Sequence, residues 1–497
     1  MLNWDLYILD PIIIILALMG IFLIWKKENG TKKSLIFFSE VLLIWVINGI
    51  FVKQNLNQLN IVSGFPTYAV VPLILFGSTA LFTIILKPVA TFLTGKFMSR
   101  RIWMWAAIGT TLIGMALSLL IKDSMSWIPL IILVSLFLAI SLASQSLYFL
   151  MLNEQFYHKI FPIESSFKMG VIINIGMFIG GYLFNITDII NTPSLNGQNQ
   201  YYVLVIISFI IGAIATALSF LNIENKELVS GFETAFKDNL IKYSSKVLIY
   251  LVIFSILFGT VFGFVQNSLI NLYIASNIAE QNGSLDQANS LIRQNSDLFS
   301  ISNMIFGYIV YKFFTRRIGL KNSVTISLMS LLVIILILTF TKNTTVFLVS
   351  SLFLGLIFSQ IFYILFGIAI MWNYRTKGIP ITGIVASAVL LGQSLPGLFI
   401  NISIGAKTGI FGLANSKEDI FNLNNEDLLE FSNSLNDVIS IIFAIAIVFC
   451  SAALIIWLFN YKTMIAEYVN LKEIDAKLVG LRKALIKAKI KTRLVIE

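Results

Sequence analysis

Long apolar stretches alternate with short polar loops along the entire chain. A helix needs about 20 predominantly apolar residues to cross the hydrocarbon core of a bilayer. Thirteen stretches meet or approach that length, so the pattern predicts an all-α integral membrane fold. The predicted spans are 10–25, 34–53, 68–98, 102–121, 128–152, 166–190, 201–222, 247–275, 298–314, 323–341, 345–372, 379–405 and 437–460.

The composition agrees with this prediction and excludes an ordinary soluble domain. Of the 497 residues, 57% are hydrophobic and 12% are charged, whereas soluble domains carry roughly 25% charged residues. The net charge is +10, yet the sequence contains no recognisable nucleic-acid-binding module. The one cysteine, Cys450, lies in the last predicted span, so no intrachain disulfide can form.

Positive charge is concentrated on every second loop. Of the 35 Lys and Arg residues, 28 lie on one set of loops and on the C-terminal tail, which together hold 11 of the 25 acidic residues. Basic loops stay in the cytoplasm when a membrane protein inserts. We therefore expect a multi-pass plasma-membrane protein surrounded by membrane lipids, with Met1 outside and Glu497 in the cytoplasm.

Two short sequences recur at almost the same distance. KFMSRR at 96–101 returns as KFFTRR at 312–317, and SQSLYFL at 144–150 returns as SQIFYIL at 359–365. The offsets are 216 and 215 residues, and an even number of predicted spans separates the two copies. This indicates an internal duplication whose halves have the same orientation in the membrane.

The duplication sets the expected domain organisation. Two six-helix bundles related by pseudo-twofold symmetry follow one extra N-terminal transmembrane helix. The expected segments are the extra helix at 1–33, the first bundle at 34–222, a cytoplasmic linker at 223–246, the second bundle at 247–460 and a basic amphipathic cytoplasmic tail at 461–497. The linker mixes aromatic and basic residues, which favours a position on the membrane surface.

The tail carries an apolar stripe at steps of three and four residues, formed by Leu471, Ile474, Leu478, Leu481, Leu485 and Ala488. This spacing predicts a helix with one apolar face. Fewer than three heptads make a weak coiled coil, because short isolated helices are marginally stable. We therefore expect the tail to cover the membrane surface or the bundles rather than to self-associate.

The chain resembles the major facilitator superfamily of transporters. In that family, a Gly and a basic cluster mark the cytoplasmic loop between the second and third helices of each bundle. The corresponding residues are Gly95 with Lys96, Arg100 and Arg101 in the first copy, and Gly307 with Lys312, Arg316, Arg317 and Gly319 in the second. Segments 162–181 and 373–397 resemble the family's fifth helix and its counterpart.

The resemblance implies two bundles that expose a central site alternately to either side of the membrane. It assigns gating to the loop residues Gly95, Arg100, Arg101, Gly307, Arg316 and Arg317. The family's loop normally holds an acidic residue, and Ser99 or Thr315 stands near that place here. We expect the four arginines to hold the cytoplasmic ends of the bundles together through helix ends and acids such as Glu154 or Glu164.

Glu40 and Lys87 are the two charges placed inside the predicted spans. A charge within a membrane is costly and is usually functional. Both residues lie roughly 10–12 Å from the cytoplasmic end of antiparallel neighbouring helices, so a Glu40–Lys87 pair is geometrically possible. Two roles stay open: Glu40 carries a coupling proton under the influence of Lys87, or the two residues are structural.

Polar side chains also recur on helices that line the cavity in the resembled family. The candidates are Gln145 with Tyr148, Gln360 with Tyr363, and the amides Gln266, Asn267 and Asn271. Amides and phenols supply donors, acceptors and aromatic surface, which suits a neutral polar solute. Alternatively, these side chains bond neighbouring helices to each other.

The sequence as a whole favours a secondary transporter for a small polar solute, with proton coupling as one option. It contains no His cluster for a metal, no Gly-rich phosphate loop and no nucleophile–base set, so no metal or cofactor is predicted and an enzyme is disfavoured. A translocator of lipids or hydrophobic compounds on the same fold, a polytopic membrane enzyme and a non-transporting scaffold stay open. We expect a monomer with a small-molecule substrate and no nucleic-acid partner.

Overall fold

The computed structural model describes residues 5–27, 30–63, 70–121, 128–157, 159–190, 198–222, 224–229, 241–341, 343–376, 378–405, 407–469 and 479–480. Within these ranges the chain is almost entirely helical and contains no strand. This confirms the prediction of an all-α chain.

The described residues of the first half form seven α-helices. They are α1 (Asp10–Lys27, preceded by the π-helical η1, Asp5–Leu9), α2 (Lys32–Ser63), α3 (Val70–Lys96), α4 (Arg101–Ser118), α5 (Ile128–Gln155), α6 (Pro162–Ile190) and α7 (Gln198–Leu221), followed by the short η3 (Lys226–Val229).

The second half contains more helix interruptions. Its elements are α9 (Ser245–Val265), α10 (Ser268–Glu280), α11 (Leu285–Ile301), η4 (Ser302–Phe306), α12 (Gly307–Val310), η5 (Tyr311–Thr315), α13 (Arg316–Ile318), α14 (Leu320–Phe340), α15 (Thr344–Asn373), α16 (Ile381–Gly405), η6 (Gly409–Gly412), α17 (Lys417–Phe421), α18 (Asn425–Ile465) and η7 (Ala466–Val469).

Eleven helical segments of the described ranges are long and apolar enough to cross a membrane. Two predicted spans, 68–98 and 102–121, coincide with α3 and α4 but are not among these eleven. The linker part at 230–240 and the heptad stripe of the tail lie outside the described residues, so both predictions stay untested.

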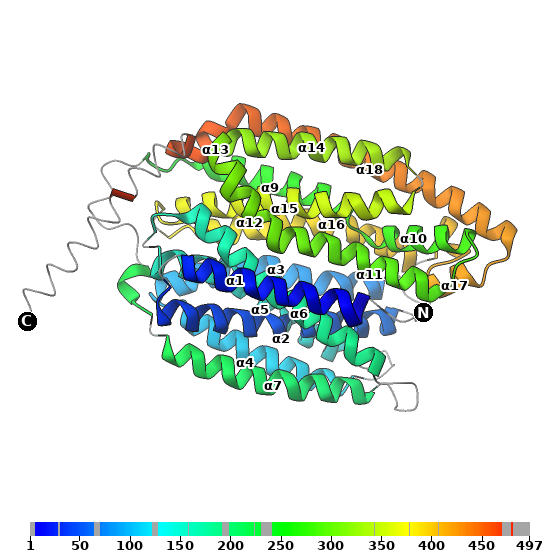
Figure 1. Cartoon of the computed structure of the whole chain (residues 1–497), viewed down its shortest axis with the longest axis horizontal. Coiled ribbons are helices and arrows are strands. Elements are labelled where there is room, and N and C mark those ends of the chain that lie inside the picture. Colours follow the sequence, from blue (N-terminus) through cyan, green and yellow to red (C-terminus); the bar gives the residue numbers. More distant parts are fainter. Residues whose placement is uncertain are drawn as a thin grey trace, which may run out of the picture.

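The helices form two groups that lie side by side (Figure 1). Helices α2–α7 pack mainly on one another, and helices α9–α18 do the same. The groups meet along two helix pairs, α3 with α16 and α6 with α15. Helix α1 packs against α6 of the first group and reaches η4 of the second.

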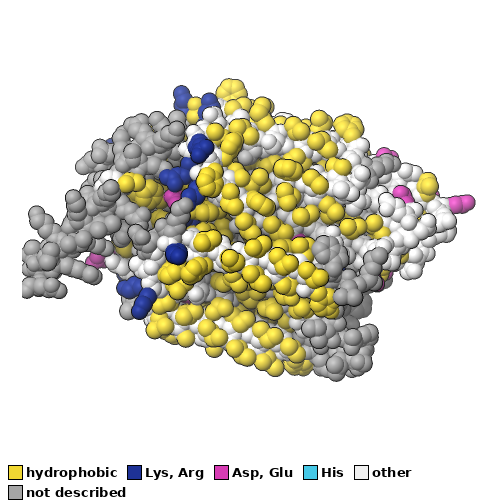
Figure 2. Space-filling view, viewed as in Figure 1, with side chains coloured by type: hydrophobic (Ala, Val, Ile, Leu, Met, Phe, Trp, Pro, Cys, Tyr) yellow, Lys and Arg dark blue, Asp and Glu magenta, His cyan; other side chains and the backbone are white. Residues whose placement is uncertain are grey.

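Charged side chains gather at opposite ends of the molecule, on either side of a broad apolar band (Figure 2). Lys and Arg side chains lie at the end where α18 finishes, which we call the basic end; Lys96, Lys246 and Arg317 are exposed there. Acidic side chains lie at the other end, near α17, which we call the acidic end. This distribution fits a membrane-embedded bundle with two chemically different faces.

One close helix pair recurs in each group. A Cβ atom at Gly49 of α2 would lie 3.0 Å from the Cα of Gly180 on α6, and a Cβ at Gly259 of α9 would lie 3.1 Å from the Cα of Gly392 on α16. Small residues let membrane helices approach closely, which replaces the hydrophobic driving force that lipid does not supply. These contacts fix the framework on which the site is built.

Candidate functional site

The candidate site extends along α15 at three levels. Ser351 is seven residues from the start of α15, Tyr363 is nineteen, and Tyr374 directly follows the last residue. At 1.5 Å per residue these positions lie roughly 10, 28 and 45 Å from the acidic end of the helix. The levels correspond to a polar cavity, a hydrogen-bonded centre and a closed basic end.

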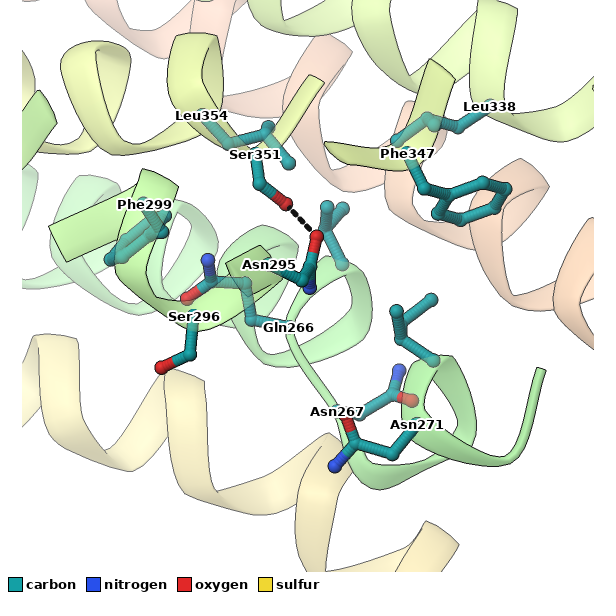
Figure 3. A pocket seen from close by; sticks show the side chains of 12 residues that line it. Gln266, Asn267, Asn271, Asn295, Ser296, Phe299, Leu338, Phe347, Ser351 and Leu354 are labelled. Carbon is teal, nitrogen blue, oxygen red and sulfur yellow. Dashed lines mark hydrogen bonds between the residues drawn. The ribbon is translucent and has the colours of Figure 1, made fainter. Parts of the chain in front are cut away.

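The first level is a cavity of about 180 Å³ within the second group (Figure 3). Its polar lining consists of Gln266, Asn267, Asn271, Asn295, Ser296 and Ser351, with Phe299 and Phe347 among the apolar residues. The Ser351 hydroxyl donates to Asn295 Oδ1 at 2.5 Å. All three amides that the sequence predicts on the seventh core helix face this cavity; their role in binding stays a prediction.

The cavity lies where the predicted span 247–275 is broken. Helix α9 ends at Val265 and α10 starts at Ser268, with Asn267 as the N-cap between them. Its Oδ1 accepts from the Leu269 backbone at 2.9 Å, and its Nδ2 donates to the Phe264 carbonyl at 2.5 Å. Asn is a strong N-cap residue, so the polar sequence at 266–268 explains why one expected helix is two.

At the second level, Tyr363 links the two groups. Asn174 Nδ2 on α6 donates to the Tyr363 hydroxyl, which donates to Asn303 Oδ1 on η4 at 3.1 Å. The Tyr363 ring packs against Phe149 and Phe167 of the first group, with centroid distances of 6.2 and 5.3 Å. A buried polar network specifies one arrangement when its members are bonded. We call Asn174, Tyr363 and Asn303 the central triad.

At the third level, Tyr374 inserts into the basic end of the first group. Its hydroxyl accepts from Asn153 Nδ2 and donates to the Leu150 carbonyl, both at 3.4 Å. Its ring lies under Lys159 Nζ at 5.6 Å. Burial, with the nearby Glu154 carboxylate, raises the pKa of Tyr374 well above its usual value, so the hydroxyl stays protonated. This residue was not predicted as functional.

Two glycines allow backbone contact between the two groups on the basic-end side of the cavity. A Cβ at Gly367 of α15 would lie 2.6 Å from Ile163 Cα on α6, and a Cβ at Gly383 of α16 would lie 2.5 Å from the Lys87 carbonyl oxygen on α3. Neither position has room for a larger residue. Both helix pairs between the groups are therefore closed towards the basic end.

The arginines of the first copy form ion pairs within the first group. Arg100 Nη2 lies 2.9 Å from Glu154 Oε1, and Arg101 pairs with Glu40. The predicted Glu40–Lys87 pair is therefore wrong, because Glu40 of α2 faces α4 rather than α3. The predicted Glu154 partner of Arg100 occurs, but neither ion pair bridges the two groups as the gating prediction required.

Glu224 supplies the acidic side chain that the loop at 96–101 lacks. Its carboxylate accepts from Ser99 Oγ at 2.8 Å, from the Arg100 backbone at 2.9 Å and from the Arg101 backbone at 3.3 Å. A carboxylate at a helix N-terminus satisfies free backbone donors and favours the helix dipole. Glu224 thus caps α4 from a segment more than 120 residues away, which no local sequence pattern signals.

The second copy is arranged differently. Gln360 is buried, its Nε2 donates to the Gly307 carbonyl at 2.6 Å, and its Oε1 accepts from Thr315 Oγ1 at 2.9 Å. Arg317 is exposed and Arg316 is half-buried. The Gln360 amide therefore binds within its own group, and its part in substrate binding stays a prediction, as does gating by these arginines.

Tyr148 and Gly95 lie beside the buried ion pairs. Tyr148 is fully buried, packs against Phe37 with a centroid distance of 6.4 Å, and its hydroxyl has no hydrogen-bond partner among the described residues. A Cβ at Gly95 would lie 3.7 Å from Arg100 Nη1. Tyr148 thus neighbours Glu40 and Arg101 rather than an open cavity.

Lys87 bonds to a neutral partner. Its Nζ donates to Gln145 Oε1 at 3.0 Å, and the side chain is 6% exposed. Gln145 is half-buried, whereas Ser144 and Ser146 on either side are buried. The structure therefore joins two predicted site residues, Lys87 and Gln145, that the sequence had placed in separate groups of candidates.

A charged cluster near the acidic end was missed entirely. Asp5 Oδ2 accepts from Arg293 Nε at 2.8 Å, which ties η1 to α11. Asp10, Lys53 and Asp297 interact electrostatically in the same region. The sequence reading began the eighth core span at 298, whereas the continuous helical segment begins at Leu285. Asp297 and Arg293 were therefore assigned to a loop.

Comparison with solved structures identifies the fold. The outward conformation of FucP, a major facilitator superfamily transporter, matches with a TM-score of 0.52 and 13% identity over 84% of this chain and 97% of that one. A bacterial homologue of the iron transporter ferroportin in an outward-facing state matches with a TM-score of 0.53 and 14% identity over 84% of this chain and 99% of that one. The human organic anion transporter MFSD10 matches with a TM-score of 0.54 and 12% identity over 84% of this chain and 100% of that one.

These matches show that the described helices adopt the fold of the major facilitator superfamily transporters, as the sequence resemblance implied. At 12–14% identity, these matches establish the fold but do not identify a substrate. No family model and no curated protein sequence matches the chain significantly.

Proposed function

We propose that the protein is a secondary transporter that moves a small polar solute across the plasma membrane by alternating access. The observation that carries this proposal is the one-sided closure of the two groups. Towards the basic end they touch through buried tyrosines and through glycines that leave no gap, whereas towards the acidic end the second group contains an amide-lined cavity. Two of the solved structures with this fold are described as outward conformations.

The proposed architecture is two six-helix bundles with pseudo-twofold symmetry and one extra helix, α1. The close glycine pairs support it: Gly49 with Gly180 and Gly259 with Gly392 are offset by 210 and 212 residues. These offsets are near the 216 and 215 residues of the repeated sequences. In this proposal α1 packs across the lateral junction of the two bundles.

The cavity favours a neutral or weakly charged solute of modest size. Its volume of about 180 Å³ is below the roughly 300–1,000 Å³ of drug-sized pockets. Gln266 and Asn271 are exposed to it and offer paired donors and acceptors, while Phe299 supplies an apolar wall. We propose that this cavity receives the solute from the acidic side.

The proposed orientation places the acidic end outside and the basic end in the cytoplasm. Single cysteines at Glu418 and Gly480, both exposed positions, in a Cys450→Ser background, should react with impermeant reagents from opposite sides of the membrane. Reaction of both from the outside would reject this topology.

Proton coupling is proposed through Lys87 rather than Glu40. Glu40 already has a guanidinium partner in Arg101, so a proton there would disrupt an internal ion pair. Lys87 has a neutral amide as its partner. Its protonation therefore responds more readily to a change of charge nearby.

The test of transport is uptake of radiolabelled small polar solutes, such as sugars, polyols, amino-acid amides and small carboxylic acids, into proteoliposomes. Gln266→Ala and Asn271→Ala should each weaken uptake of the accepted solute about tenfold, because a buried polar group of the bound solute loses its partner. Asn322→Ala, which removes an exposed amide at the basic end, is the matched control. No uptake of any solute beyond protein-free liposomes would reject the proposal.

A further inference from the structure

Lys87 differs from three other buried cations of the first group. The pairs Arg100 with Glu154, Arg101 with Glu40 and Lys168 with Glu164 each place a carboxylate beside the cation. Lys87 forms no ion pair among the described residues, and no charged side chain acts on it. An isolated buried charge is expensive, and proteins either pair it or neutralise it.

Gln145, the partner of Lys87, has a second hydrogen-bonding group that can contact a ligand. An ammonium group has donors only, so the Gln145 amide turns its Oε1 towards Lys87 at 3.0 Å. The Nε2 group of the same amide is then left as a donor. An ammonium and an amide donor side by side match the two oxygens of one carboxylate.

Gln145 also lies on a side of α5 that is turned away from lipid. Leu133, the lipid-exposed residue of α5, is 39% exposed. Leu142 and Gln145 are half-buried and lie roughly 120–180° around the helix from Leu133, at about 100° per residue. The exposed part of Gln145 therefore belongs to the inner side of the first group.

Lys87 and Gln145 lie at the depth of the central triad. They are nine and ten residues from the basic ends of α3 and α5, and Tyr363 is ten residues from that end of α15. At 1.5 Å per residue, all three lie roughly 14–15 Å from the basic ends of their own helices. Lys87 also lies beside the first turn of α16, where Gly383 contacts its carbonyl oxygen.

The segment that carries Lys87 is also part of the contact between the groups. Gly383 of α16 packs on the Lys87 carbonyl, and Ser387 Oγ donates to the Ile84 carbonyl at 2.6 Å. Neither α16 residue is titratable, and among the described residues the side chain bonded to Lys87 Nζ is Gln145. A ligand on Lys87 thus acts directly on the junction that must open.

We propose that Lys87 and Gln145 form a subsite for the carboxylate of a small monocarboxylic acid, and that the acid is carried together with one proton. This rests on the proposed transport function and specifies its substrate class. At a pH at which the Lys87 amine is uncharged before the acid binds, it takes up one proton to become an ammonium, and the acid binds as its carboxylate, so no net charge is added to the buried site. No covalent bond forms or breaks.

A single cation selects this class of ligand. Phosphates and dicarboxylates carry more charge than one ammonium neutralises, and phosphate sites usually employ arginine forks or several donors. A neutral solute would leave the buried ammonium without a counter-charge. The amides of Gln266, Asn271 and Asn295 line the separate cavity of the second group, nearer the acidic end, and suit hydroxyl groups of an acid that enters there first.

The test compares acids with their uncharged amides on the purified full-length protein. The probes are acetate, lactate and gluconate beside acetamide, lactamide and gluconamide. Thermal stabilisation reports binding, and a pH indicator in weakly buffered solution reports proton uptake. At least one acid should stabilise the wild type with uptake of one proton per bound acid, while its amide should not.

Three variants separate charge from structure. Lys87→Met should lose acid binding at least about tenfold, as expected when a charge-assisted hydrogen bond is removed. Lys87→Arg should keep binding but take up no proton, because a guanidinium is always charged. Lys96→Met, the exposed cation on the same helix, should behave like wild type. If Lys87→Met does not fold, Lys87→Gln replaces it.

The proposal is overturned if no acid stabilises the protein, if the amides act as well as the acids, or if Lys87→Met binds acids normally. Proton uptake by Lys87→Arg would also reject it. In each of these cases the uptake screen with small polar solutes still decides the transport function, so the two proposals fail separately.

Discussion

Gly170 on α6 faces the ring of Tyr363 on α15 so closely that a Cβ atom at Gly170 would overlap the ring. Only glycine leaves Tyr363 in place to bond with Asn174 and Asn303. The closed arrangement of the two groups therefore depends on the absence of a side chain at Gly170.

Gly170→Ala should fold but favour separation of the groups, because overpacking costs about 1–3 kcal/mol in the closed arrangement. The reporter is a cysteine at Ile163, which is 3% exposed beside Gly367, in a Cys450→Ser background. Its alkylation should accelerate several-fold in Gly170→Ala. Gly109→Ala, where nothing lies within 4 Å of the new methyl group, should leave the rate unchanged; equal rates in both variants would contradict the role of Gly170.

Tyr374→Phe should loosen the basic end. The change removes the hydroxyl that bonds to Asn153 and to the Leu150 carbonyl, a loss of about 1 kcal/mol. Hydrogen–deuterium exchange should therefore increase at 150–155, the last turn and a half of α5. Tyr202→Phe, which removes an exposed phenol of α7, is the control. Unchanged exchange at 150–155 would show that the ring alone, and not the hydroxyl, maintains the contact.

Glu40→Gln should destabilise the protein by about 3–5 kcal/mol, because it leaves the Arg101 guanidinium buried and unpaired. Adding Arg101→Met should restore much of the thermal stability, whereas adding Lys87→Met should not. This double-mutant comparison separates the observed partner from the one that span positions suggested. Rescue by Lys87→Met would mean that Glu40 and Lys87 interact after all.

The difference between these two partners shows where sequence reasoning ends. Apolar length and the repeated motifs predicted the helices and the fold, because those depend on local composition. The identity of Glu40's partner depends on how α2 is rotated against α3 and α4, which packing decides. Glu224 and Tyr374 were missed for a similar reason: each acts on a helix distant in sequence, and the sequence alone does not show that contact.

The cavity was easier to anticipate than the closed basic end. Gln266, Asn267 and Asn271 are polar residues in an otherwise apolar stretch. Exposing their amides to lipid would cost free energy, so a position at a polar cavity is expected. Gln145 and Gln360 occupy equivalent positions in the repeat, yet Gln145 is bonded to the cation of Lys87 and Gln360 to the neutral groups of Gly307 and Thr315. A repeat predicts position but not the partners that neighbouring side chains supply.

Asp5 and Arg293 should contribute to the docking of the extra helix. Asp5→Asn weakens a pair in which Arg293 is 25% exposed, so the expected loss is at most about 1 kcal/mol. The reversed pair Asp5→Arg with Arg293→Asp should recover thermal stability relative to either single reversal. A double reversal no more stable than the single ones would show that α1 docks through its apolar contacts alone.

The measurement that tests alternating access most directly uses spin-label distances at both ends of the molecule in a Cys450→Ser background. One pair, Lys96→Cys with Arg317→Cys, joins the two groups at the basic end, and the other, Tyr202→Cys with Glu426→Cys, joins them at the acidic end; all four positions are exposed. Gly170→Ala should add a longer distance to the first pair and a shorter one to the second. Lengthening of both pairs, or no change in either, would contradict a transporter that closes one side as it opens the other.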